Sequence, residues 1–323
     1  MNRITVSAPG KLMLLGEHAV VDNHPCLVTA VDQRMRVTVE ILDILEFQLE
    51  AMDVNVTGYR KPLRELGVGD IPKGAKFVEI AIKNINEKYP IKTGLKITTT
   101  SEFSSQFGFG SSSASTVCVV KALSQLLKLK LTNKEIFDIS YKTVLDIQGK
   151  GSGFDVGAAV YGGTLYFVTG GKMIEPLKIR SLSLIVGYSG VKADTVTLMN
   201  NVKVTFANKQ DRLTKIYNDI EDLVNQAKVV LVKGDLKTFG ELMNKNQKYL
   251  QELGVSIDKL DNMIKGALAA GAYGAKLSGA GGGDCMIAIS PENKEKEVER
   301  RIKQAGGEII DVATNAEGVR IES

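Results

Sequence analysis

The sequence predicts an α+β protein of two domains, and three observations lead to this prediction. The first third of the chain is rich in β-branched, strand-like segments, long amphipathic helices occupy residues 194–270, and strand-like segments return in the last quarter. The chain has 323 residues, 44% of them hydrophobic and 24% charged, which is long enough for two cores of ordinary size. We place the boundary near residue 178, giving domains of residues 1–178 and 179–323.

The order of the elements follows from residue patterns. Apolar, β-branched runs predict strands at residues 3–8, 25–40, 46–50, 94–100, 164–169, 172–174, 183–188, 274–277, 284–290, 309–312 and 319–321. Helical spacing predicts helices at residues 75–89, 133–147, 194–208, 210–233, 236–253, 258–270 and 293–305, and one more that ends at residue 127 after a glycine and serine loop. Thr132 is the expected N-cap of the 133–147 helix, and Gly234 and Gly254 separate the long helices.

The charge balance argues against a nucleic-acid partner. Lys and Arg number 41 against 37 Asp and Glu, a net charge of +4 with no long basic run. No apolar stretch approaches the roughly 20 residues that span a bilayer. The three scattered cysteines, Cys26, Cys118 and Cys285, are typical of reduced thiols, and two histidines cannot form a zinc site by themselves. These features predict a cytoplasmic protein that does not bind membranes.

The segment Phe107–Val120, FGFGSSSASTVCVV, is a glycine and serine loop that leads into an apolar helix. The first N–H groups of a helix have no partner within it and carry partial positive charge, so anions bind there. Gly108 and Gly110 allow close approach to the backbone, and Ser111 and Ser112 offer hydroxyls. A phosphate-binding loop and an ordinary serine-capped helix are both consistent with this segment.

Three other glycine clusters lie at Ala8–Lys11, Gly149–Asp155 and Ser278–Asp284. None has the GxxxxGK[ST] pattern of a P-loop, and the GxGxxG pattern of a dinucleotide fold is broken at Ser113. Phosphoryl transfer needs a phosphate cradle, a cation and a group that receives the proton of the alcohol. Lys11 is a candidate cation and Asp155 a candidate base, although a surface lysine and a helix N-cap are the simpler interpretations.

Three motifs in order resemble those of the GHMP small-molecule kinases: APGKLMLLGEHAVV at residues 8–21, FGFGSSSAS at residues 107–115 and KLSGAGGGDC at residues 276–285. The GEHAVV version and the segment Glu241–Asp261 are similar to the mevalonate kinase branch of that family. The resemblance covers nearly the whole chain. It implies the two-domain fold of the family, with an N-terminal domain like ribosomal protein S5 and a ferredoxin-like C-terminal domain.

The resemblance also implies roles for individual residues. Asp155 and Lys11 fall on the catalytic aspartate and lysine of the family, and Glu17, His18 and, more loosely, Thr195 fall near its acceptor substrate. For ATP, the resemblance implies that the phosphates are bound by Gly108, Gly110, Ser111 and Ser112, and that Ser112 also lies near Mg2+. The third motif, which lines the site beside the phosphates, contains Gly279, Gly281 and Gly282.

Two departures from the family pattern leave alternatives open. Val144 stands where mevalonate kinases carry a metal-binding glutamate, and Asp146 lies on another face of the same helix. Lys150 and the surroundings of Asp155 are more similar to phosphomevalonate kinases, where Lys150 would suit an acceptor that bears a phosphate. A sugar kinase is disfavoured by Ala19-Val20 after Glu17-His18.

The resemblance therefore implies ATP- and Mg2+-dependent phosphorylation of the primary alcohol of mevalonate, in isoprenoid precursor synthesis. Phosphomevalonate kinase is the alternative, and a nucleotide-binding sensor that lacks turnover is a third possibility. Retention of both Lys11 and Asp155 argues against the sensor. A homodimer is an expectation from the family only.

Overall fold

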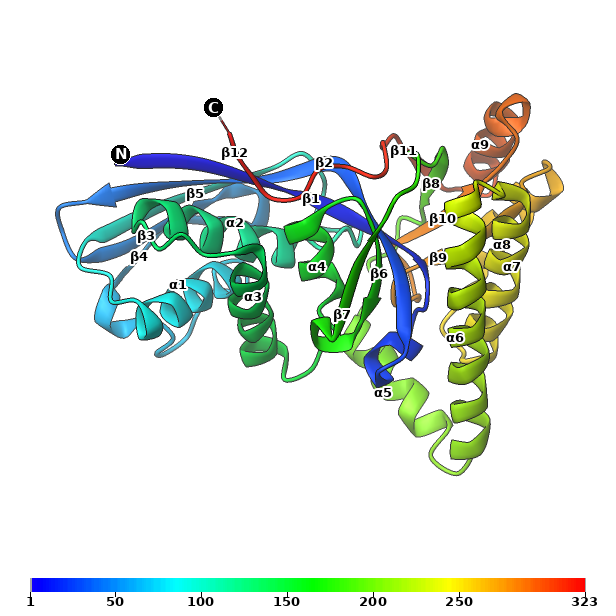
Figure 1. Ribbon diagram of the computed structural model, residues 1–323, viewed down its shortest axis with the longest axis horizontal. Coiled ribbons are helices and arrows are strands. Elements are labelled where there is room, and N and C mark those ends of the chain that lie inside the picture. Colours follow the sequence, from blue (N-terminus) through cyan, green and yellow to red (C-terminus); the bar gives the residue numbers. More distant parts are fainter. Residues whose placement is uncertain (1, 323) are drawn as a thin grey trace.

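The computed structural model describes residues 2–322 and contains a large sheet and a small one, each covered by helices (Figure 1). The large sheet has the strand order β12-β1-β2-β5-β3-β4, and β6 and β7 extend it from the far end of β2. Its strands are β1 (Arg3–Leu15), β2 (Pro25–Leu42), β3 (Glu46–Ala51), β4 (Val56–Pro62), β5 (Gly94–Ser101), β6 (Thr164–Val168), β7 (Met173–Leu177) and β12 (Arg320–Glu322). All neighbouring pairs are antiparallel except β3 and β5.

Four helices lie below the large sheet in Figure 1: α1 (Lys76–Lys88), α2 (Ser111–Leu126), α3 (Asn133–Gln148) and α4 (Phe154–Tyr161). Helix α2 is the central one, because it packs on β1 and β2 and also touches α1, α3 and α4. Its middle, from Ala114 to Leu123, is almost entirely buried. The N-terminus of this helix is thereby held in one position relative to the sheet.

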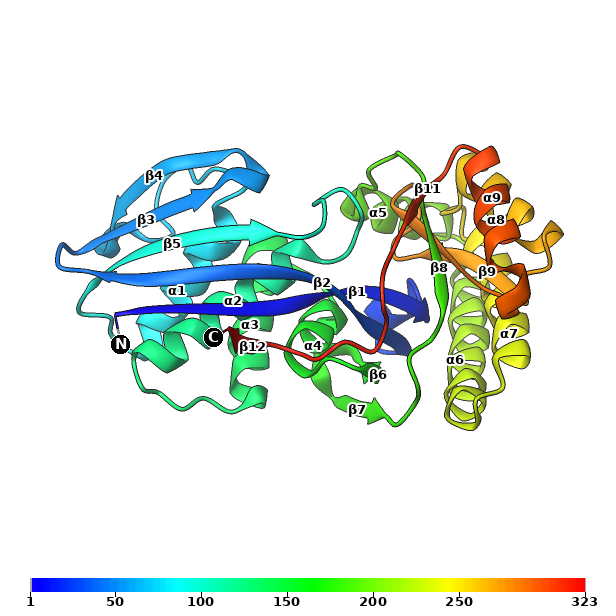
Figure 2. The ribbon, with the colours of Figure 1, turned by 90° about the horizontal axis from the view of Figure 1, so that it is seen from above.

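The small sheet lies at the other end of the molecule and is antiparallel throughout, with the order β11-β8-β10-β9 (Figure 2). Its strands are β8 (Leu184–Tyr188), β9 (Gly274–Ser278), β10 (Cys285–Ile289) and β11 (Glu308–Ile310). Its helices are α5 (Thr195–Thr205), α6 (Gln210–Lys233), α7 (Leu236–Glu252), α8 (Asp258–Ala269) and α9 (Glu295–Gln304). Short 3-10 turns occur at η1 (Ala19–Asp22), η2 (Met52–Val54), η3 (Leu63–Glu65), η4 (Thr169–Gly171) and η5 (Glu292–Lys294).

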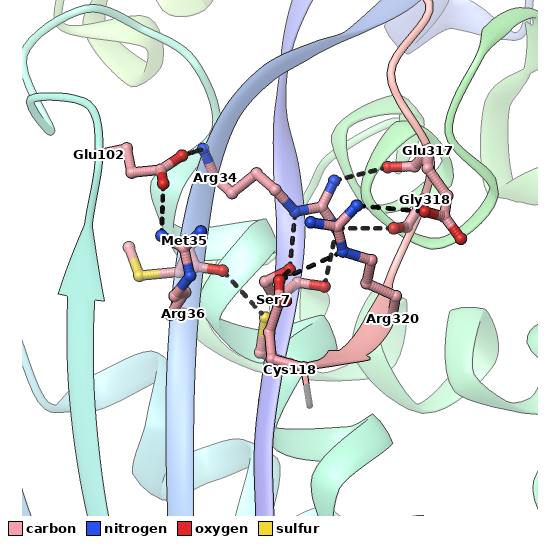
Figure 3. A network of polar contacts seen from close by, with 10 residues as sticks. Ser7, Arg34, Met35, Arg36, Glu102, Cys118, Glu317, Gly318 and Arg320 are labelled. Carbon is pink, nitrogen blue, oxygen red and sulfur yellow. Dashed lines mark hydrogen bonds and ion pairs between the residues drawn. The ribbon is translucent and has the colours of Figure 1, made fainter.

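The C-terminal segment joins the two halves, because β12 follows the small sheet but pairs with β1 of the large one. The buried side chain of Arg34 on β2 holds this segment (Figure 3). Its guanidinium donates to the carbonyl oxygens of Glu317 and Gly318, each at 2.8 Å, and to the hydroxyl of Ser7 at 2.7 Å. The division of the chain at residue 178 stays a prediction.

The α+β class predicted from the sequence is confirmed, as are most of the elements. Thr132 caps α3 in a capping box with Glu135, and Gly234 and Gly254 both have positive φ. Strand β1 is longer than expected, because a register shift at Pro9 and Gly10 lets the strand continue past them. Strand β4 was not expected, since it is a largely exposed edge strand with no apolar alternation.

Within residues 2–322, none of the helices combines the length and the apolar character needed to cross a membrane.

Candidate active site

A cavity of about 760 Å³ brings together segments from both halves of the chain. One end is lined by residues of the β3–β4 region and α1, and the other by η1 and α5. Ser111, Ser112 and Ser113 at the start of α2 also line the cavity. Most residues singled out in the sequence line the cavity: Lys11, Glu17, His18, Gly108, Gly110, Ser111, Ser112, Lys150, Asp155, Thr195 and Gly279.

The phosphate-loop candidate opens onto this cavity at the N-terminus of α2. Gly110 is the N-cap residue, with φ +80°, and no side chain caps the helix. The serine-capped helix is therefore excluded, and Ser111, Ser112 and Ser113 stand at the cavity wall. The free first-turn N–H groups of a 16-residue helix offer hydrogen bonds and partial positive charge to an anion in the cavity.

Lys11 lies between this loop and Asp155. Its ammonium donates to the carbonyl oxygen of Gly108 at 2.8 Å and is 3.4 Å from Oδ1 of Asp155. Its side chain is only 9% exposed, which excludes the surface-lysine interpretation. Asp155 is in the first turn of α4, but the N-cap of that helix is Gly153, so Asp155 is not a capping residue. Its Oδ1 is buried and accepts no hydrogen bond.

Glu17 is buried, and both of its carboxylate oxygens have protein partners. One pairs with the ammonium of Lys276 on β9, and the other accepts from Nδ2 of Asn246 on α7 at 3.0 Å. Lys276 is also fully buried, and this burial lowers its pKa. Glu17 thus ties the turn before η1 to the small sheet, and its negative charge is compensated within the protein.

His18 has φ +62°, an uncommon conformation for a residue with a side chain. Its Nε2 lies 2.8 Å from the carbonyl oxygen of Ala280, to which a protonated Nε2 donates. Burial lowers the pKa of His18, which favours the neutral imidazole. The contact with Ala280 therefore aligns the first and third sequence motifs across the cavity.

Lys150 and Thr195 lie at the η1 and α5 end of the cavity. The ammonium of Lys150 donates to Oδ1 of Asn200 on α5 at 2.9 Å. Thr195 is the exposed first residue of α5, which Asp194 caps by accepting from the N–H of Thr197. Both residues line the cavity.

Gly281 and Gly282 do not line the cavity, unlike Gly279. The N–H of Gly282 donates to the carbonyl oxygen of Val255 at 2.7 Å, and a Cβ on Gly281 would lie 2.2 Å from that same oxygen. A Cβ on Gly282 would meet Leu198 at 2.7 Å. These two glycines therefore allow the third motif to pack closely against its neighbours, a role in packing rather than in ligand contact.

The sequence reasoning missed several residues of the cavity. Asp53, Val54, Phe77, Val78 and Thr99 form its wall at the β3–β4 end, and no local pattern marks them. Asp284 was more visible in the sequence, because it ends a glycine run, and in the structure it has φ +54°. Its Oδ2 lies where a Cβ of Gly108 would be, 2.4 Å from that position, so the third motif packs on the phosphate loop.

The oxygen atoms of the cavity fit a magnesium ion held largely by substrate phosphates. Val144 lines the cavity but offers no oxygen, and Asp146 lies in a separate cavity of about 450 Å³, paired with Lys142 at 2.6 Å. This confirms that Asp146 does not replace the missing glutamate. No group of three or more His, Cys, Asp or Glu residues is arranged to hold a metal in residues 2–322. The hydroxyl of Ser112 and the carboxylate of Asp155, whose Oδ1 accepts no hydrogen bond, are hard oxygen donors of the kind that suits Mg2+.

Comparison with known proteins agrees with this geometry. Residues 76–163 match the family described as GHMP kinases N terminal domain, and residues 227–308 match GHMP kinases C terminal. The chain is 36% identical to a protein named mevalonate kinase from Pyrococcus abyssi, over 99% of this chain and 98% of the relative.

Solved structures show the same fold. The mevalonate kinase of Methanococcus jannaschii superposes with a TM-score of 0.82 at 27% identity, over 98% of this chain and 99% of the other. The phosphomevalonate kinase of Streptococcus pneumoniae has a TM-score of 0.81 over 96% of this chain and 99% of the other, but at 19% identity it shows the fold alone. From its full-length relatives, its two matched domains and its shared fold, the chain belongs to the GHMP kinase family.

Proposed function

We propose that the protein phosphorylates the primary alcohol of mevalonate with ATP, which gives 5-phosphomevalonate and ADP. Six relatives named mevalonate kinase, 34–36% identical over 99% of this chain, support this acceptor. The observation that carries the proposal is the position of Lys11, whose ammonium lies between Asp155 and the phosphate loop. This is the arrangement that phosphoryl transfer to an alcohol needs.

In the reaction, a bond forms between the hydroxyl oxygen of mevalonate and the γ-phosphorus of ATP, and the bond from that phosphorus to the bridging oxygen of ADP breaks. Asp155 receives the hydroxyl proton. Lys11 stabilises the negative charge on the transferred group, because its ammonium is held at the loop by Gly108. The first-turn N–H groups of α2 bind the phosphates without reorganisation, since the helix is fixed in the core.

The two ends of the cavity suit the two substrates. Apolar Val54, Phe77 and Val78 at the β3–β4 end suit a purine ring, with Asp53 and Thr99 as polar groups beside it. The opposite end, with His18, Lys150 and Thr195, suits a small hydroxy acid, whose carboxylate would be attracted by Lys150. The γ-phosphate would then lie between them, at Lys11 and Asp155.

Magnesium would be held by the nucleotide phosphates together with the Ser112 hydroxyl. When bound, it neutralises charge on the phosphates. A second carboxylate ligand is not required for Mg2+, which commonly uses one or two carboxylates plus substrate oxygens and water. Val144 is compatible with this arrangement. A cytoplasmic location and a homodimer stay predictions.

Phosphomevalonate is the second candidate acceptor, and Lys150 is the residue that favours it. The charge of Glu17 does not argue against it, because Lys276 compensates that charge. The favoured acceptor is mevalonate, since the full-length relatives carry that name.

The test is to measure ADP release from purified protein with ATP and Mg2+ and either mevalonate or phosphomevalonate. We expect turnover with mevalonate. Turnover with phosphomevalonate alone would establish the second candidate, and ATP binding without turnover of either would establish a sensor. Omitting Mg2+ should abolish the activity.

A further inference from the structure

Lys192 lies in the short segment between β8 and α5, and its side chain reaches the segment that leads into the phosphate loop. Its ammonium donates to the carbonyl oxygen of Ser105 at 2.7 Å. The side chain is 51% exposed and lines the active-site cavity. Lys192 comes from the half of the chain that carries the small sheet, whereas Ser105 and the loop come from the other half.

The backbone on both sides of Lys192 is hydrogen-bonded to Asp284. The N–H of Asp284 donates to the carbonyl oxygen of Val191 at 2.7 Å, and the N–H of Ala193 donates to Oδ1 of Asp284 at 3.0 Å. Gly283 packs on the same backbone, since a Cβ there would lie 2.5 Å from the oxygen of Val191. These contacts hold the backbone of Lys192 close to the phosphate loop. The half-exposed side chain can still move its ammonium from the carbonyl of Ser105 to another hydrogen-bond acceptor.

The charges around the phosphate loop favour an anion as the new hydrogen-bond acceptor of Lys192. Lys11 is paired with Asp155, so those two groups together add little net charge. The partner of Lys192 is a neutral carbonyl, and Oδ1 of Asp284 lies farther away at 3.8 Å. A phosphate oxygen accepts a stronger, charge-assisted hydrogen bond from an ammonium than a carbonyl does.

The position of Ser105 indicates which phosphates of a bound nucleotide Lys192 can reach. Phe103, Ser104 and Ser105 line the cavity, and in the chain they stand between Thr99, at the wall proposed for the purine, and the loop glycines. Lys150, by contrast, is bound to Asn200 at the acceptor end. Lys192 therefore contacts the segment that leads into the phosphate loop, whereas Lys150 contacts α5.

We propose that Lys192 binds the non-transferred phosphates of the nucleotide and so links the two halves of the chain through the bound ADP or ATP. The proposal rests on the proposed kinase function. Lys192 exchanges the carbonyl of Ser105 for a phosphate oxygen when nucleotide binds. It contributes to nucleotide affinity and not to the chemical step.

The test compares ADP and adenosine binding by isothermal titration calorimetry, without acceptor and with Mg2+ present. In Lys192→Met the dissociation constant of ADP should rise about tenfold, while that of adenosine, which lacks phosphates, should change less than about twofold. Lys192→Arg keeps the charge and should recover most of the ADP affinity. Lys178→Met, which changes an exposed lysine outside the cavity, is the matched control and should leave both constants unchanged.

Equal losses of ADP and adenosine affinity in Lys192→Met would overturn the proposal, because they would show that Lys192 does not act on the phosphates. Unchanged ADP affinity would overturn it as well. In steady state the KM for ATP should rise with kcat unchanged. Wild-type protein that binds ADP but does not phosphorylate mevalonate would contradict the proposed acceptor and leave the Lys192 comparison valid, so the two failures are distinguishable.

Discussion

At the scale of single residues, the site depends on buried charges whose partners come from distant parts of the chain. Lys11 on β1 meets Asp155 on α4, and Glu17 before η1 meets Lys276 on β9. In the proposed reaction the first pair borders the reacting atoms, and Oδ1 of Asp155 accepts no hydrogen bond. In the second pair Glu17 also accepts from Asn246, so the pair holds the turn that carries His18.

Asp155→Asn should lower kcat by about 10³-fold, because an amide cannot receive the proton of the alcohol. The dissociation constant of ADP should change little, since the phosphate loop is intact. The control is Asp146→Asn, which removes a carboxylate from the neighbouring helix α3 in a separate cavity and should keep near-normal turnover. If Asp155→Asn retained more than about a tenth of the activity, Asp155 would not be the base.

The buried imidazole of His18 should make stability depend on pH. Burial lowers the pKa of His18 in the folded protein below its ordinary value of 6.5, so between these two values the unfolded chain binds more protons than the folded one. The contribution of His18 to the free energy of unfolding should therefore be fully present above about pH 6.5 and decrease as the pH falls below that value.

Urea unfolding at several pH values between about 5 and 8 measures this effect. The variant His18→Gln should show a smaller decrease below about pH 6.5 than the wild type. Identical pH dependence in the two proteins would assign the decrease to other groups.

At the scale of elements, the loop before α2 must combine two positive φ angles with close packing. Gly108 has φ +74°, and a Cβ there would lie 2.4 Å from Oδ2 of Asp284. Gly149, after α3, has φ +71° but nothing within 4 Å of its Cβ position. The two glycines thus share a backbone conformation and differ in their surroundings.

This contrast predicts different results for two alanine substitutions. Gly149→Ala should cost only about 1 kcal/mol of stability from the left-handed conformation and leave ADP affinity unchanged. Gly108→Ala adds a collision with Asp284 and should weaken ADP binding by tenfold or more, since the loop must move. Calorimetric titration with ADP measures both variants, and equal affinities would show that the loop tolerates a shift.

At the scale of the whole molecule, the C-terminal strand returns from the small sheet to the large one (Figures 1 and 2). Arg34 holds the segment before this strand by donating hydrogen bonds to the main-chain carbonyl oxygens of Glu317 and Gly318 (Figure 3). The two sheets are also joined where Oγ of Ser278 meets the backbone of Met13. The relative position of Lys11 and the third motif depends on these links.

Arg34→Met should lower the free energy of unfolding by about 3 kcal/mol, because it leaves buried carbonyl oxygens without donors. Arg36→Met is the control: this neighbour on β2 is partly exposed, and its ion pair with Glu102 is worth less than about 1 kcal/mol. Urea unfolding of the two variants and the wild type measures both losses of free energy. Equal losses would mean that the buried network does not hold the C-terminal strand.

Much of the fold could be predicted from local patterns, because they record local physics. The capping box at Thr132 and the left-handed glycines after α6 and α7 are properties of a few neighbouring residues. Strand β4 escaped prediction, since an exposed edge strand needs no apolar alternation. The wall formed by Asp53, Phe77 and Thr99 escaped as well, because its residues come from separate elements.

By itself, the sequence determined the α+β class, the order of most elements and the three motifs that mark the family, since each depends on residues close together in the chain. Only the tertiary structure decided which candidates face the substrate cavity. It placed Lys11 beside Asp155, closed Glu17 into an ion pair with Lys276, and brought Lys192 to the phosphate loop. The physical reason is that burial and charge pairing depend on contacts between distant segments, which appear only when the two halves of the chain pack together.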